Sequence, residues 1–106
     1  MSDFLAAAQA MAAELTAFQA DLHRHPELSL QEYRTTEKVK AALDGLGLEP
    51  VELGLDTGAA ALLKGGDGPL VLLRADLDAI AQQEPAGHDP RSETDGVMHA
   101  CGHDVH

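Results

Sequence analysis

The sequence predicts an α/β fold in which two N-terminal helices pack on part of a mixed β-sheet. Apolar residues recur at helical spacing in the first part of the chain, over residues 3–25 and 29–46. After Pro50 the apolar residues alternate with polar ones, and residues 70–73 form a continuous apolar run. A change from a period of 3.6 to a period of 2 is typical of helices followed by strands.

The first helix is expected over residues 3–25, with an apolar face made of Phe4, Ala8, Met11, Leu15, Phe18 and Leu22. The spacing also suits a coiled coil, but three heptads without charged flanks support that weakly, so we favour a helix that covers a sheet. Pro26 ends the helix, because the residue before a proline is biased out of the helical conformation. His23 and His25 lie in the last turn, where the helix dipole favours histidine, and we interpret both as structural.

The second helix is expected over residues 29–46. Ser29 to Glu32 has the Ser-x-x-Glu form of a capping box, in which the Ser29 hydroxyl accepts a hydrogen bond from a free backbone N–H of the first turn. Gly47 suits the left-handed conformation that ends a helix. The buried side is predicted to consist of Tyr33, Val39, Ala42, Leu43 and Leu46.

Three strands are predicted next, over residues 51–55, 59–64 and 70–80. The run at residues 70–73 is typical of a strand buried on both faces. Such a strand normally needs neighbours on both sides, so we expect an exposed sheet edge and a tendency to associate. Residues 82–96 are polar and rich in Pro, Gly and Asp, which predicts a surface loop.

Composition excludes several classes of partner. The net charge of −11 repels phosphate backbones and anionic membrane surfaces. A single cysteine forms no internal disulfide, the first residues lack the features of a signal peptide, and no apolar run approaches the roughly 20 residues that span a bilayer. We therefore expect a soluble cytoplasmic protein.

The last ten residues hold the densest group of reactive side chains. They contain the only cysteine, three of the six histidines and an aspartate: His99, Cys101, His103, Asp104 and His106. Thiolate, imidazole and carboxylate are the side chains that bind zinc and similar ions. One short segment rarely completes a tetrahedral site, so further ligands have to come from elsewhere in space. The alternative is a solvated, histidine-containing tail.

Two further carboxylates, Asp76 and Asp78, lie at the end of the third predicted strand. Their spacing of two residues places them on the same side of a strand. The ends of central strands are where open α/β sheets bind ligands. The alternative is that one carboxylate pairs with Arg74 and the other caps a loop.

Three segments together resemble a known family. Residues 22–29 (LHRHPELS), 73–80 (LRADLDAI) and 96–104 (GVMHACGHD) are similar, in this order, to the N-terminal part of aminoacylase/carboxypeptidase-type metallo-amidohydrolases, peptidase family M20. The nearest subgroup is that of the hippurate hydrolases, N-acyl-amino-acid amidohydrolases and auxin-conjugate hydrolases. The resemblance implies that residues 1–106 are the N-terminal portion of a larger zinc-peptidase-like catalytic domain. The inserted lid domain, through which relatives form homo-oligomers, is then absent from this sequence.

The resemblance also implies an activity, the hydrolysis of small N-acyl amino acids with two divalent metal ions of the zinc, manganese, cobalt or nickel type. By the same resemblance Cys101 and His103 are metal ligands and Asp78 orients a ligand. The residues implied to lie close behind the ligands are Asp76, His99, Asp104 and His106.

The general-base glutamate of the family comes later in sequence than residue 106, and neither Glu84 nor Glu93 matches it. Ala81 stands where relatives usually carry a proline. We therefore expect the isolated chain to be inactive. Two alternatives remain, a non-catalytic metal-binding module or remnant, and a structural domain with a His-rich end.

Overall fold

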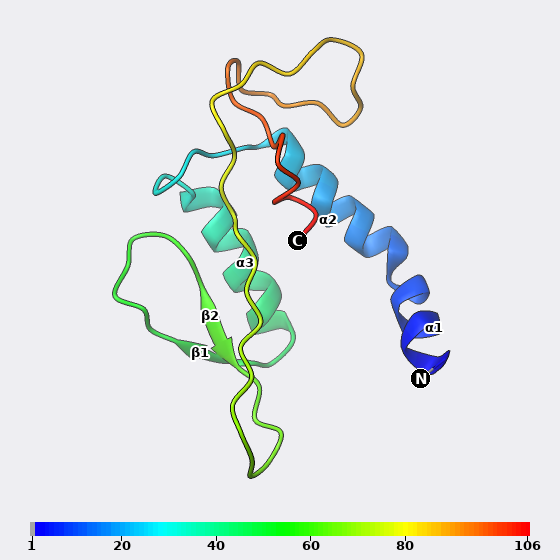
Figure 1. Cartoon of the computed structure of the whole chain (residues 1–106), viewed down its shortest axis with the longest axis vertical. Helices are drawn as coiled ribbons and strands as arrows, with labels where there is room; N and C mark the ends of the chain where they lie inside the picture. Colours follow the sequence, from blue (N-terminus) through cyan, green and yellow to red (C-terminus); the bar gives the residue numbers. More distant parts are fainter. Residues whose placement is uncertain (1) are drawn as a thin grey trace.

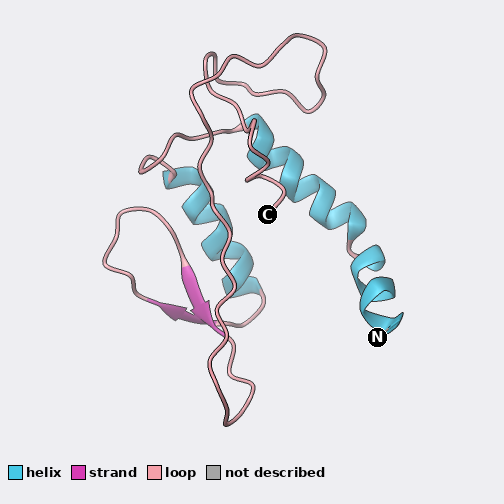
Figure 2. Cartoon of the chain, viewed as in Figure 1, coloured by secondary structure: helices cyan, strands magenta, loops and turns pink. Residues whose placement is uncertain are grey.

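The computed structural model describes residues 2–106 and has the predicted α/β character. It contains three helices, α1 (Ser2–Ala10), α2 (Ala12–Arg24) and α3 (Tyr33–Gly45), and two strands, β1 (Glu49–Val51) and β2 (Ala60–Leu62). Figure 1 shows α1 and α2 in line with each other, with α3 beside them and the strands near the end of α3. The rest of the chain is loop, as Figure 2 shows. No helix in the described range is long and apolar enough to cross a membrane.

The first helix is interrupted, which the sequence did not indicate. Met11 has a ψ of 0° and its N–H bonds to the carbonyl of Ala8, three residues back, so one turn is tighter than an α-helix. Leu22 is buried, but the side chains of Phe4, Met11 and Leu15 are exposed. The predicted apolar face is therefore covered only near the end of α2.

The start of α3 corrects the predicted capping box. The helix begins at Tyr33 instead of residue 29, and Ser29 makes no cap. The carboxylate of Glu27 takes that place, since it accepts the backbone N–H groups of Arg34 and Thr35 at 3.0 and 2.6 Å. An acid at the N-terminus of a helix satisfies free N–H groups and interacts favourably with the helix dipole.

The buried side of α3 also differs from the prediction. The most buried side chains are Thr35 and Thr36, whereas Tyr33 and Leu46 are exposed. The hydroxyl of Thr35 donates to Glu27, and the hydroxyl of Thr36 accepts the N–H of Gly58. Hydrogen bonding of these hydroxyls accounts for their burial. Gly47 has a φ of +72°, which confirms its predicted role after the helix.

The two strands form an antiparallel hairpin that is shorter than predicted. Glu49 pairs with Leu62 and Val51 with Ala60. Every residue of β1 is exposed and every residue of β2 is half-buried. The hairpin covers the end of α3. It contributes no residue to the two segments that carry the candidate site side chains, residues 76–80 and 98–106, which we call the reactive segments.

Residues 70–78 form no strand, contrary to the prediction. The side chains of residues 70–73 are 79–92% exposed, so the predicted burial on both faces is wrong. The physical reason is that, within residues 2–106, no strand lies beside this run to pair with its backbone or cover its side chains. The expected exposure of apolar surface is present, on this run and on the helix face around Phe4.

Isolated backbone bridges hold the reactive segments together. Ala79 forms a parallel bridge with Leu28, and Ile80 an antiparallel bridge with Met98. Ala79 and Met98 are buried, together with Leu22 of α2. These bridges bring residues 78–80 and 98–106 to the C-terminal end of α2, where Figure 1 shows the chain end lying close to that helix.

Candidate functional site

His103 is held by Asp78. Its Nδ1 lies 2.9 Å from both the backbone oxygen and the Oδ1 of Asp78. Both partners are acceptors, so Nδ1 carries the proton and donates. Hydrogen bonding to the Asp78 backbone, and then to its carboxylate, raises the pKa of His103. The other ring nitrogen, Nε2, is 3.9 Å from Asp76 Oδ2, which is longer than a hydrogen bond.

The neighbours of His103 are accessible. Cys101 is an exposed free thiol. His106 is exposed, with its ring centroid 5.6 Å from that of His103. Asp76 pairs with Arg74, as the alternative interpretation of the two aspartates predicts, while Asp78 bonds to His103. Both carboxylates therefore lie on the side of the chain that faces His103.

His99 is buried without a polar partner. It is 5% exposed, and neither ring nitrogen has a hydrogen-bond partner. Burial lowers its pKa, which favours the neutral imidazole. A neutral imidazole has one donor and one acceptor to satisfy. The ring of His99 can therefore hydrogen-bond to a further polar group, beyond the described side chains.

Asp104 is tied to α2. Its Oδ2 lies 2.9 Å from Nδ1 of His23, and Gln19 also donates to it. The other ring nitrogen of His23, Nε2, lies 2.7 Å from Oε2 of Glu84. Glu84 in turn accepts the backbone N–H of Ser92. We call His23, Glu84 and Asp104 the buried triad, because all three side chains are almost fully excluded from solvent.

Charge in the buried triad is well defined. Burial alone raises the pKa of Glu84, but the Ser92 N–H and the rings of His23 and His88 outweigh it and lower the value to about 2. Burial likewise opposes the charged form of His23, but its bonds to Glu84 and Asp104 prevail and raise its pKa. Each ring nitrogen of His23 lies against a carboxylate oxygen, so both contacts favour the protonated imidazolium.

The site residues fit part of a metal site. A histidine that donates one ring nitrogen to a carboxylate and leaves the other open is the usual arrangement of a metal ligand, and His103 has it. Cys101, two residues away, offers a thiol of the kind that zinc-like ions bind. Within residues 2–106, however, no group of three or more His, Cys, Asp or Glu side chains is placed to hold a metal ion.

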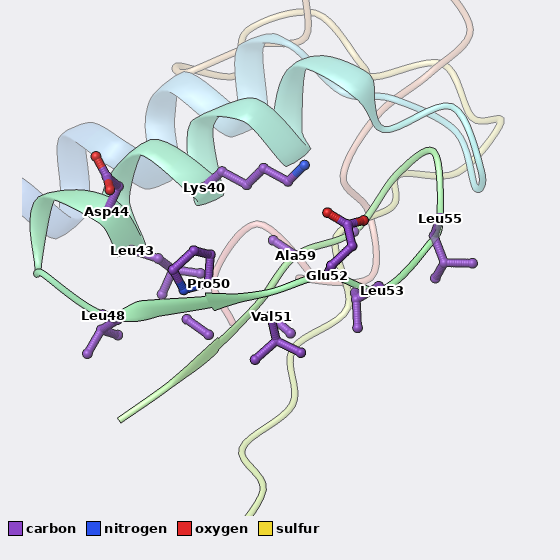
Figure 3. A pocket seen from close by; sticks show the side chains of 13 residues that line it. Lys40, Leu43, Asp44, Leu48, Pro50, Val51, Glu52, Leu53, Leu55 and Ala59 are labelled. Atoms are coloured by element: carbon purple, nitrogen blue, oxygen red, sulfur yellow. The ribbon is translucent and has the colours of Figure 1, made fainter. Parts of the chain in front are cut away.

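A separate pocket of about 360 Å³ lies between α3 and the hairpin. Figure 3 shows Lys40 of α3 on one side of it and Pro50 and Glu52 on the other. No histidine or cysteine lines it, and it shares no residue with the reactive segments. It is therefore distinct from the candidate metal site.

The sequence did not reveal the triad. Glu84 lies in a stretch predicted as a surface loop, which it is, yet Glu84 and Ser92 within it are buried. His23 is structural, as the sequence predicts, but its ring bonds to two carboxylates that the sequence did not indicate. No local pattern marks either contact, because the partners lie 61 and 81 residues from His23 along the chain.

The chain is similar in sequence to part of several bacterial hydrolases. No family model matches the chain. An uncharacterized hydrolase of Staphylococcus saprophyticus is 49% identical over 92 residues, which are 87% of this chain and 24% of that protein. The N-acetylcysteine deacetylase of Bacillus subtilis is 46% identical over 94 residues, 87% of this chain and 25% of that protein.

Two solved structures have the same fold over most of this chain. A Bacillus subtilis protein, described as a dinuclear metal binding peptidase from the M20 family, superposes with a TM-score of 0.86 at 44% identity over 91% of this chain and 27% of that one. The chain is homologous to part of an M20 peptidase. A proposed aminohydrolase from methicillin-resistant Staphylococcus aureus superposes with a TM-score of 0.88 at 30% identity, over 97% of this chain and 28% of that one.

The resemblance read from the three sequence segments is thereby confirmed, and the M20 relatives are hydrolases. The chain spans about a quarter of the length of the curated relatives it matches. One of the M20 structures binds two metal ions, which agrees with a divalent metal cofactor.

Proposed function

We propose that this chain contributes metal ligands to a hydrolase that cleaves the amide bond of N-acyl amino acids. The relatives support hydrolysis in general, and one of them is an N-acetylcysteine deacetylase. The proposed substrate is a small N-acyl amino acid, and the proposed products are a carboxylate and a free amino acid.

The observation that carries the proposal is the contact between His103 and Asp78. It fixes the tautomer with the proton on Nδ1 and leaves the lone pair of Nε2 free to bind a cation. Cys101 is exposed on the adjoining turn, and Gly102 between them has a φ of +86°, a conformation that side chains disfavour. The turn at Gly102 allows Cys101 and His103 to converge on one ion.

Each remaining residue of the segment has a proposed task. Divalent ions at such a site supply polarisation of the amide carbonyl and acidify a water molecule. Asp78 orients His103 and increases its basicity. Asp104 anchors the segment through the buried triad. Asp76, His99 and His106 lie close to His103 and add charge or hydrogen-bonding capacity beside the ions.

Two ligands do not complete a catalytic site, since zinc-type catalytic sites use three protein ligands. We infer that the remaining ligands and the general base come from residues other than the described ones, and that this chain is the N-terminal portion of a catalytic domain. By itself it is expected to bind metal weakly and to show no hydrolysis. A lid domain that mediates homo-oligomers belongs to the same proposal.

Calorimetric titration of the chain with Co²⁺ tests the ligand assignment. We expect weak binding of one ion, lost in Cys101→Ala and in His103→Ala and retained in His25→Ala, which removes a histidine that contacts Asp21 and Glu93. Equal binding by all four proteins would refute the assignment. The same two ligand substitutions at the matching positions of the Bacillus subtilis N-acetylcysteine deacetylase are expected to abolish amide hydrolysis together with metal content.

A further inference from the structure

His23 connects three parts of the chain. It belongs to α2, its Nε2 bonds to Glu84 of the loop, and its Nδ1 bonds to Asp104 of the C-terminal segment, at 2.7 and 2.9 Å. Asp104 directly follows the proposed ligand His103. A single ring thus links the segment that carries both proposed ligands to the body of the fold.

The chemistry of these contacts defines the state of the ring. Ionised carboxylates only accept hydrogen bonds, so each ring nitrogen of His23 has to donate. Side-chain exposure is 12% for His23, 2% for Glu84 and 4% for Asp104. Charge-assisted hydrogen bonds that are excluded from water are among the strongest that side chains make.

Few other contacts anchor residues 100–106, which follow the Ile80–Met98 bridge. Ala100, Cys101, Val105 and His106 are exposed, so they contribute little buried apolar surface to the fold. Residues 102–105 form a turn in which the N–H of Val105 donates to the oxygen of Gly102 at 3.0 Å. Beyond this turn, the side-chain hydrogen bonds of the segment run from Asp104 to α2 and from His103 to Asp78.

We propose that His23 is a positioning residue, which holds the turn at residues 102–105 against α2 and so fixes where Cys101 and His103 present their ligand atoms. That the turn positions metal ligands rests on the proposed function. That His23 holds the turn against α2 does not. His23 itself contacts neither metal nor substrate.

Amide hydrogen exchange of the chain, followed by NMR, tests the positioning directly. In His23→Gln, which has one donor nitrogen in place of two and so cannot donate to both carboxylates as the ring does, we expect exchange at the Val105 amide to accelerate about tenfold or more. Because loss of a His23 contact also lowers the global stability, exchange at the Leu46 amide, which bonds within the last turn of α3, is expected to accelerate by less than exchange at Val105. His25→Gln is the matched control, because His25 caps the C-terminal end of α2, two residues from His23, but contacts Asp21 and Glu93.

An acceleration at Val105 that exceeds the acceleration at Leu46 supports the proposal. Equal acceleration at Val105 and Leu46 shows general destabilisation and overturns it, as does unchanged exchange at Val105. If His23→Gln does not fold, the wild-type chain decides: two slowly exchanging ring N–H protons on His23, each coupled to a carboxylate, support the proposal, and a single ring N–H proton overturns it.

Co²⁺ absorption separates the two proposals. The thiolate-to-Co²⁺ band of the chain is expected to require about tenfold more Co²⁺ in His23→Gln than in wild type, and to vanish in Cys101→Ala. If Cys101→Ala leaves Co²⁺ binding unchanged, the proposed function fails while the exchange result still decides the role of His23. If Cys101→Ala abolishes the band and His23→Gln leaves it unchanged, the ligands stand and the positioning of them by His23 is refuted.

Discussion

The C-terminal end of α2 and the run at residues 70–73 differ in which kind of side chain is buried there. Around α2, the buried triad and the backbone bridges of Ala79, Ile80 and Met98 bring three stretches of chain together. The run at residues 70–73 is entirely apolar and yet is 79–92% exposed. Polar residues are thus buried in the first region, and apolar residues are exposed in the second.

The contrast follows from what each kind of interaction needs. Polar groups can be buried only where each finds a partner, and His23 provides two donors for Glu84 and Asp104. Apolar strands need neighbouring strands on both sides, and none lies beside residues 70–73 within the described chain. Within residues 2–106, the reactive segments are therefore held by hydrogen bonds more than by a hydrophobic core.

Substitution of His23 is expected to have the largest effect on stability. His23→Ala leaves Glu84 and Asp104 as buried carboxylates without their cation, which costs about 3–5 kcal/mol of unfolding free energy. His25→Ala, which removes partly exposed pairs, is expected to cost less than about 1 kcal/mol. Urea unfolding followed by circular dichroism measures both values. Similar losses in the two variants would mean that the triad adds no particular stability.

The contribution of His23 is expected to depend on pH in a bell-shaped manner. The pKa of His23 is raised from 6.5, so its stabilising effect is complete below pH 6.5 and is lost as pH rises through the folded-state value. The pKa of Glu84 is lowered from 4.5 to about 2, so its effect is complete above pH 4.5 and is lost as pH falls toward 2. The other groups around His23 are Asp104, His88 and His99.

The measurement is the difference in unfolding free energy between wild type and His23→Ala at a series of pH values. Groups that do not touch His23 cancel in this difference, which is expected to be largest between pH 4.5 and 6.5. A difference that stays constant from pH 3 to pH 9 would contradict the imidazolium assignment.

Removal of the Glu27 carboxylate is expected to have an intermediate effect. Glu27→Ala frees two backbone N–H groups at the start of α3 and the buried hydroxyl of Thr35, with an expected cost of about 1–2 kcal/mol. Ser29→Ala, at the residue that the capping box pointed to, is expected to change stability by less than about 0.5 kcal/mol. Thermal unfolding of both variants measures the difference, and a larger loss for Ser29→Ala would restore the sequence-based cap.

Substitution in the exposed apolar run is expected to have the smallest effect on unfolding. Leu72 is 85% exposed, so Leu72→Lys changes the unfolding free energy by less than about 0.5 kcal/mol. The substitution is expected to weaken association of the chain clearly, because a charge interrupts an exposed apolar patch. Sedimentation velocity at increasing concentration measures this. An association that persists unchanged in Leu72→Lys would exclude residues 70–73 as its cause.

Local patterns predicted a good part of the molecule. The helical period located α2 and α3 to within a few residues, and Gly47 marked the end of α3 because few other residues adopt a φ of +72°. The break at Met11 escaped detection, since alanine-rich sequence favours a continuous helix. The start of α3 was misplaced because Glu27, which caps it, is separated from its partners by seven and eight residues.

In the candidate site, too, some features follow from local sequence and others from the tertiary structure alone. The sequence by itself marked Cys101, His103 and Asp78 as candidates, because the donor atoms that metal ions prefer are a property of side-chain chemistry, and their roles at a metal ion stay predictions. Only the tertiary structure placed Asp78 against His103, and only it showed that His23 pairs with Glu84 and Asp104. Hydrogen bonds between residues 25 to 81 positions apart leave no periodic trace in a sequence, since they depend on how the folded chain brings distant segments together.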